Sequence, residues 1–104
     1  MGTNNLDYST LTVTDTAQVV NTACSPVMPT NAQGAIMTVE TAPIRWRDDG
    51  TVPTSTEGHL MDAGDVLTFD SWTVPNSNWK QVLRAIQVIR TTATSGALKI
   101  SWYD

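Results

Sequence analysis

The chain has 104 residues, of which 40% are hydrophobic and 15% charged, and ten acidic against six basic residues give a formal charge of −4. This length favours one domain with one modest core. The negative charge argues against nucleic-acid binding, which needs clustered Lys and Arg, and no run of about 18 apolar residues is present to span a bilayer.

Residues 1–9 are polar and show no hydrophobic period. We therefore expect an N-terminal arm, followed by a single domain over residues 10–104. The first residues lack the basic and apolar regions of a signal peptide, so we expect a protein made in the cytoplasm. The single cysteine, Cys24, cannot form an internal disulfide. Stability is expected to come from packing or from a partner.

Most of the remaining chain alternates apolar and polar residues, which is the period of a half-buried strand. Trp46 and Trp102 fall on the apolar faces of two such segments, so we expect both in the core. Ile100 shares the face of Trp102. The alternating segments are residues 10–20, 34–42, 43–47, 59–61, 66–70, 84–92 and 97–103.

The segments between the predicted strands carry turn residues. Residues 24–31 contain two prolines, which cannot donate to a strand ladder. Residues 48–58 begin with Asp-Asp-Gly, and Asp-Gly permits a tight reversal. Helical spacing of apolar residues occurs once, and it predicts a single helical turn near residues 77–82.

This pattern predicts an all-β fold. Seven or eight short antiparallel strands, separated by turns rich in Gly, Pro, Asp and Asn, are typical of a β-sandwich or jelly-roll-like domain. We expect the last two long strands, residues 84–92 and 97–103, to form a hairpin in the centre of a sheet.

Candidate reactive groups are few. His59 is the only histidine, so a zinc site is not expected, and we interpret it as a loop residue bonded to backbone. No G-x-S-x-G motif marks a nucleophile. Cys24 has no basic neighbour and is expected to be buried and inert. The turn acids lack the spacing of a calcium loop and suit reversals of the backbone: Asp48, Asp49, Asp62, Asp65 and Asp70. We expect no enzyme, cofactor, metal or small-molecule substrate.

Four exposed side chains could meet a partner. Trp72 and Trp79 lie among Pro, Asn and Ser, where they either cover the end of the core or anchor a partner or a sugar. Arg45 and Arg47 alternate with core residues and share an outward face. That face is either solvated, with local acid partners, or reaches across a subunit boundary, where Arg is favoured.

A resemblance adds to this interpretation. Roughly residues 40–103 resemble small all-β proteins encoded among the virion genes of tailed bacteriophages. In those proteins an arginine-containing strand runs into D-G-T-x-P-T, followed by a G-H turn, an A-G-[DE] turn and a closing hairpin. The matching motifs here are Ala42–Thr54, Gly58-His59, Ala63-Gly64-Asp65, Ile89-Arg90-Thr91 and Ala97–Ile100.

The resemblance implies a capsid decoration (cement) protein on the outside of a phage capsid, or an accessory protein of the head or tail. The expected partners are the major capsid protein or other virion proteins, together with further copies of the chain, as a trimer. The expected partner-interface residues are Asn4, Asn5, Leu6, Tyr8, Arg45, Arg47, Trp72 and Trp79. The alternatives are a tail, collar or fibre adaptor, and a carbohydrate-binding module that uses Trp72, Trp79 or Tyr103.

Overall fold

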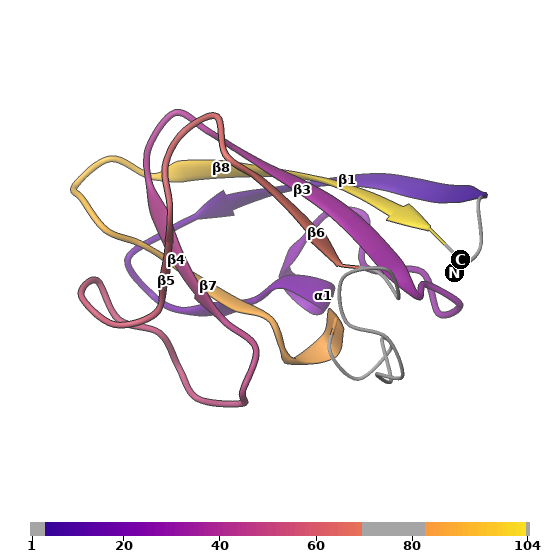
Figure 1. The fold of residues 1–104 in the computed structure, drawn as a ribbon, viewed down its shortest axis with the longest axis horizontal. Coiled ribbons are helices and arrows are strands. Elements are labelled where there is room, and N and C mark those ends of the chain that lie inside the picture. Colours follow the sequence, from indigo (N-terminus) through magenta and orange to yellow (C-terminus); the bar gives the residue numbers. More distant parts are fainter. Residues whose placement is uncertain (1–3, 70–82, 104) are drawn as a thin grey trace.

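The computed structural model describes residues 4–69 and 83–103 of the chain. They form eight strands and a short helix, and residues 83–85 are also helical (Figure 1). The helical turn predicted at 77–82 lies outside the described residues. The elements are β1 (Asn5–Val13), β2 (Gln18–Val19), α1 (Val20–Ala23), β3 (Gly34–Glu40), β4 (Ile44–Arg47), β5 (His59–Met61), β6 (Val66–Phe69), β7 (Gln87–Arg90) and β8 (Gly96–Tyr103).

The strands form two antiparallel sheets that pack face to face. Sheet A has the order β1-β8-β3-β6 and sheet B the order β2-β7-β4-β5. Strand β4 pairs with β5, β3 with β6, β2 with β7 and β1 with β8, so the chain is a long double-stranded ribbon rolled up on itself. This is the jelly-roll arrangement, and the predicted all-β sandwich is confirmed.

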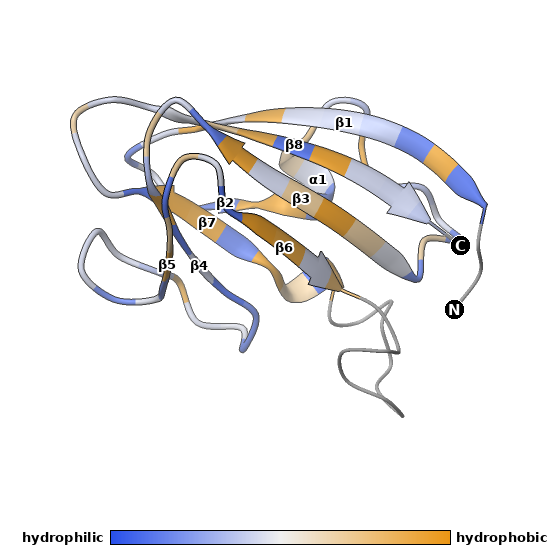
Figure 2. Ribbon diagram, turned by 45° about the horizontal axis from the view of Figure 1, so that its top comes forward, coloured by the Kyte–Doolittle hydropathy of each residue, from blue (hydrophilic) through white to orange (hydrophobic). Residues whose placement is uncertain are grey.

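The core lies between the two sheets. Along β8 every second residue is buried, including Leu98, Ile100 and Trp102, and β3 buries Met37 and Val39 in the same way. Figure 2 shows this alternation as orange and blue or pale bands along β3 and β8. Each fully buried aliphatic side chain of this size stabilises the fold by roughly 1.5–3 kcal/mol. The inward face predicted for β8 from Ile100 and Trp102 is confirmed.

The arm expected at residues 1–9 is wrong for residues 5–9, which are the first half of β1. They pair with β8 from Asn5 opposite Tyr103 to Ser9 opposite Ile100. Alternation is hidden here because the inward residue is the polar Ser9, which is fully buried. A rule that looks for apolar residues at every second position does not detect such a strand.

The hairpin expected from the last two strands is also wrong. Strand β7 belongs to sheet B and β8 to sheet A, so residues 91–95 cross from one sheet to the other. Gly96 makes this crossing possible, because a Cβ there would lie 2.7 Å from Ile44 Cγ2 and 2.8 Å from the Ala42 carbonyl oxygen. Periodicity assigns a strand to a face but does not name the strand beside it.

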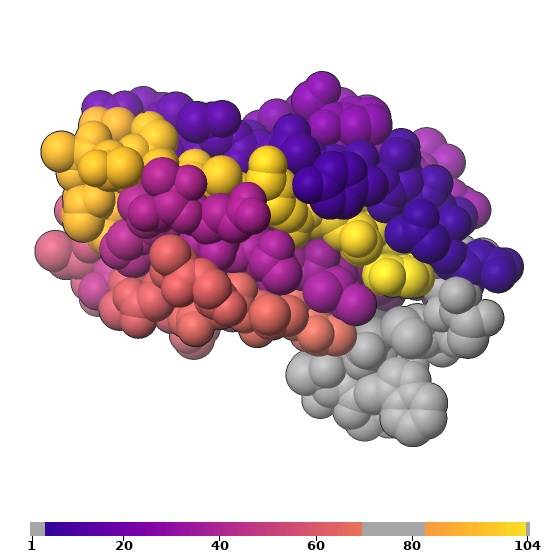
Figure 3. Space-filling model, turned by 90° about the horizontal axis from the view of Figure 1, so that it is seen from above, coloured from indigo at the N-terminus to yellow at the C-terminus, as the bar shows by residue number. Residues whose placement is uncertain are grey.

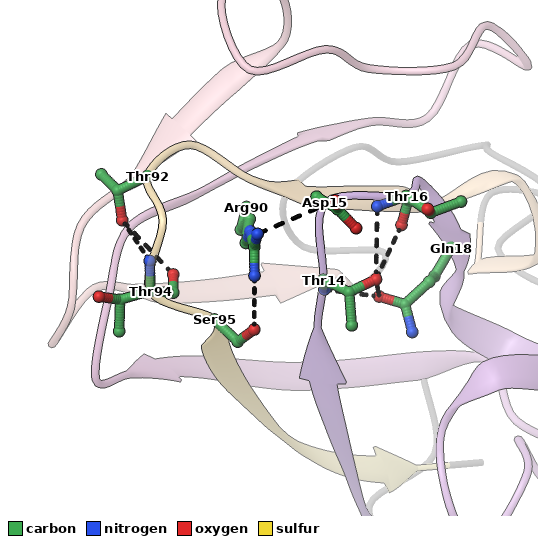
Figure 4. Close-up of polar contacts among 8 residues, drawn as sticks. All are labelled: Thr14, Asp15, Thr16, Gln18, Arg90, Thr92, Thr94 and Ser95. Carbon is green, nitrogen blue, oxygen red and sulfur yellow. Dashed lines mark hydrogen bonds and ion pairs between the residues drawn. The ribbon is translucent and has the colours of Figure 1, made fainter.

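The crossing is tied to the β1–β2 turn. Arg90 donates through its backbone N–H to the Thr14 carbonyl at 2.9 Å and through Nη1 to Ser95 Oγ at 3.1 Å. Its Nη2 lies 3.9 Å from Asp15 Oδ2, and Gln18 Oε1 accepts from the Thr14 N–H at 3.0 Å (Figure 4). These contacts close one end of the sandwich.

Within the part of the chain that the structure describes, no helix is long and apolar enough to cross a lipid bilayer.

Candidate functional site

The chain's own connection between β4 and β5, residues 48–58, packs over part of the outer face of sheet B, while Val19 and Leu60 of the same face stay exposed. Arg45 points outward from β4 and donates through Nε to the Ser55 carbonyl at 3.1 Å and through Nη1 to the Gly58 carbonyl at 2.9 Å. Pro53 of this connection is fully buried. The guanidinium of Arg45 therefore binds this loop to the sheet.

Gly58 lets the loop approach β4 this closely. Its φ is +132°, a region that side chains with a Cβ rarely adopt. A Cβ at this position would also lie 3.2 Å from the Trp46 carbonyl oxygen and 3.3 Å from Pro53 Cβ. The Gly58-His59 pair thus marks the return of the chain to β5.

A shallow depression of about 480 Å³ lies at the end of β4 and the start of β5, lined by Arg47, Asp48, Asp49, Glu57, Gly58 and His59. Arg47 pairs with Asp49 through both Nε and Nη2. The hydrogen bonds from Arg47 and from the Thr51 N–H lower the pKa of Asp49 from 3.8 to about 2. The one arginine of the depression is thus neutralised locally.

His59 packs as an aromatic ring at the edge of this depression. It lies in β5, with its ring centroid 4.7 Å from that of Trp46, and Trp46 in turn packs edge-on against Phe69 at 5.5 Å. Across residues 4–69 and 83–103, no group of three or more His, Cys, Asp or Glu side chains could hold a metal ion. The rings of Phe69, Trp46 and His59 thus continue the packing of the core to the end of the sandwich.

A second depression, of about 400 Å³, lies where the 48–58 loop meets the end of β7. Its charged groups are Arg90 and Asp15, which are bound to each other and, for Arg90, to Ser95. The remaining lining is mainly proline, threonine and serine, so neither depression presents an unpaired cation to an anionic ligand.

The buried polar groups belong to the core. Trp102 donates its indole N–H to Ser9 Oγ at 2.9 Å, and Ser9 donates to the Pro26 carbonyl at 2.6 Å. Cys24 is buried, as expected, and lies 3.2 Å from the same carbonyl. Burial raises the pKa of its thiol, which suppresses the reactive thiolate.

The outer face of sheet A contrasts with that of sheet B, because β1, β8, β3 and β6 lie side by side across it in one continuous surface (Figure 3). Tyr8 and Ile36 flank Ser101 in one row, and Val66 lies opposite Thr38 in the next. The outward positions, which we call the open face, are Tyr8, Thr10, Thr12, Ala97, Lys99, Ser101, Tyr103, Ile36, Thr38, Glu40, Val66 and Thr68.

Three large apolar side chains of the open face are accessible to solvent. Tyr8 is 53% exposed, Ile36 39% and Val66 62%. Its charged residues are Lys99 and Glu40, whose Nζ and Oε2 lie 3.9 Å apart. The open face is therefore neutral on a chain whose formal charge is −4.

The residues expected at a partner interface are dispersed. Tyr8 lies on the open face, Asn4 is exposed, and Leu6 packs partly buried against the core. Asn5 donates through Nδ2 to the Trp102 carbonyl at 3.3 Å.

Two arginines and two tryptophans were also expected at a partner interface. Arg45 and Arg47 contact the chain's own 48–58 loop, and Trp72 and Trp79 lie outside the described residues. Sequence reasoning missed Ile36 and Val66 as surface residues. The signal for Ile36 was its alternation with the inward Met37, which places an apolar residue on the solvent side of a strand.

Comparison of the chain with protein-family models, with curated proteins and with solved structures gave no match.

Proposed function

We propose that this chain is a non-enzymatic structural protein of a tailed-phage virion, which decorates the outside of the capsid shell and stabilises it as a homo-oligomer. The proposal rests on the resemblance of residues 40–103 and on one structural contrast. The chain's own loop packs over part of the outer face of sheet B, whereas no loop among the described residues crosses the open face of sheet A, which is neutral and partly apolar.

A cement protein works through its surface. It binds across neighbouring shell subunits and opposes their separation, and many weak contacts on one particle add up through multivalency. A sandwich with one face that no loop of residues 4–69 and 83–103 crosses suits this task. The net negative charge suits solubility before assembly.

The proposal is a homo-oligomer, and the resemblance implies that it is a trimer at threefold positions of the shell. The subunits of a trimer would meet through two different patches, as in any cyclic assembly of more than two copies.

The test is thermal release of DNA from particles. Virions stripped of the protein are heated beside the same virions resupplied with it, and DNA release is followed with an intercalating dye. We expect release at a higher temperature in resupplied particles, with saturation at a fixed number of copies per shell subunit. Equal release temperatures, or no saturable binding, would contradict cementing. Binding of only a few copies at the tail would assign the chain to the adaptor class.

A further inference from the structure

We infer that the open face is a contact between two copies of this chain, packed sheet to sheet about a twofold axis. The inference rests on the proposed function, because it names the surface through which neighbouring copies would meet. It also differs from the expected trimer, since a twofold contact uses the same patch on both copies.

The shape of the open face suits another sheet. Strands β1, β8, β3 and β6 are paired in register across its full width, and Figure 3 shows their side chains as one surface without a deep hollow. Two such faces can stack about 10 Å apart, as the layers of a sandwich do. Tyr8, Ile36 and Val66 would then lose their exposed apolar surface to the partner.

The charges favour a second copy over a strongly charged partner. The copies carry −4 each and repel one another, so they approach with the smallest electrostatic cost through a face that is neutral. The open face carries one positive and one negative group, Lys99 and Glu40. A twofold axis that passes between them brings each group beside its opposite in the second copy.

The area of the open face predicts weak association between two copies. Four strands about 4.8 Å apart and about seven residues long, at about 3.3 Å per residue, cover roughly 450 Å². A stable interface usually buries about 800 Å² on each partner. We therefore expect monomers in dilute solution and pairs at high concentration, a condition that a crowded shell surface provides.

The first test is sedimentation velocity over a range of protein concentrations. We expect the wild-type chain to pass from monomer to dimer, and Ile36→Lys to weaken association by at least about tenfold, because it replaces an apolar side chain of the contact with a charged one. Leu60→Lys is the matched control. Leu60 is 51% exposed on β5 of sheet B, so this variant should associate like the wild type.

Circular dichroism and thermal melts establish that both variants are folded. A wild-type chain that stays monomeric at millimolar concentration, that forms only trimers, or that loses association equally in the Leu60 and Ile36 variants would overturn the inference.

The second test exchanges the two charges of the open face. Glu40→Lys places two lysines near each other in both copies and should weaken pairing, and the double variant Glu40→Lys/Lys99→Glu should restore it. Failure of the double variant to recover would overturn the proposed position of the axis and with it the inference.

Shell binding is measured separately with the same variants. If the chain does not pair but still binds the shell saturably, and Ile36→Lys leaves that binding unchanged, the proposed function stands without the twofold contact. Pairing through this face without shell binding would reject the proposed function instead.

Discussion

Trp102 of β8 donates its indole N–H to Ser9 Oγ of β1 at 2.9 Å, and neither side chain is accessible to water. The Ser9 hydroxyl in turn donates a hydrogen bond to the Pro26 carbonyl oxygen at 2.6 Å. One polar chain therefore joins the two paired strands of sheet A to the segment that follows α1. The Ser9 hydroxyl thus accepts a hydrogen bond from the buried Trp102 N–H and donates one to the Pro26 carbonyl at the same time.

Replacing Ser9 with alanine should destabilise the fold by about 1–3 kcal/mol, because the Trp102 N–H is left buried without an acceptor. Urea unfolding followed by tryptophan fluorescence measures the loss. Ser55→Ala is the control, since Ser55 is exposed and offers its backbone carbonyl to Arg45. In a double-mutant cycle with Trp102→Phe, the coupling should be about 1 kcal/mol. Additive effects would show that the contact is unimportant.

The sequence allowed the fold class and most strand faces to be predicted, because hydrophobic alternation is a local property. Ile100 and Trp102 were placed inward on that basis, and they are buried. The pairing of β8 with β1 and β3 could not be predicted, because it depends on contacts between residues far apart in the chain. The burial of Ser9 was not predicted, because a serine in a sequence reads as a surface residue until its hydrogen-bond partners are known.

The candidate surface was predictable only in part. Arg45 was correctly placed on the outward face of β4, but its partners, the Ser55 and Gly58 carbonyls, follow from the path of the 48–58 loop. No periodicity encodes that path. Tyr8 was named from an expected arm and proved to be part of a sheet face. Ile36 could be recognised as an apolar residue on the solvent side of a strand, but its importance depends on the arrangement of sheet A, which no described loop crosses.

Replacing Arg45 with lysine should loosen the 48–58 loop without unfolding the sandwich. An ammonium group cannot make both contacts of the guanidinium fork, so the loop should lose about 1 kcal/mol of local stability. Hydrogen exchange of residues 53–58, measured by mass spectrometry, should become about fivefold faster. Arg84→Lys is the control, because Arg84 is exposed in the helical residues 83–85, and it should leave this segment unchanged. Unaltered exchange in the Arg45 variant would contradict the role assigned to this side chain.

Replacing Gly96 with alanine should cost about 1–3 kcal/mol, because the added methyl group meets Ile44 Cγ2 and the Ala42 carbonyl at less than 3 Å. Gly64→Ala is a useful comparison. This variant also adds a methyl group, but the space around position 64 is open. Its loss of stability therefore reports only the effect of the φ of +96° at that position. Thermal unfolding should rank Gly96→Ala as the less stable variant. The reverse order would contradict the close packing of the sheet crossing.

The carboxyl of Asp49 should titrate at a pKa of about 2, well below its ordinary 3.8, because Arg47 and the Thr51 N–H bond to its charged form. A lowered native pKa means that the stabilisation is complete above pH 3.8 and is lost as the pH falls through about 2. Arg47→Gln should raise the pKa of Asp49 towards 3.8, and Arg45→Gln should not. Carboxyl chemical shifts across an acid titration measure both values. An Asp49 pKa that is unchanged in Arg47→Gln would contradict the ion pair between Arg47 and Asp49.

The most direct measurement of the central claim is a cryo-electron microscopy reconstruction of the intact particle. The account predicts jelly-roll density on the outer surface of the shell, in many copies, with sheet A facing a second copy and the 48–58 loop on the opposite side. Density for this chain confined to the tail, or its absence from the shell exterior, would contradict the account.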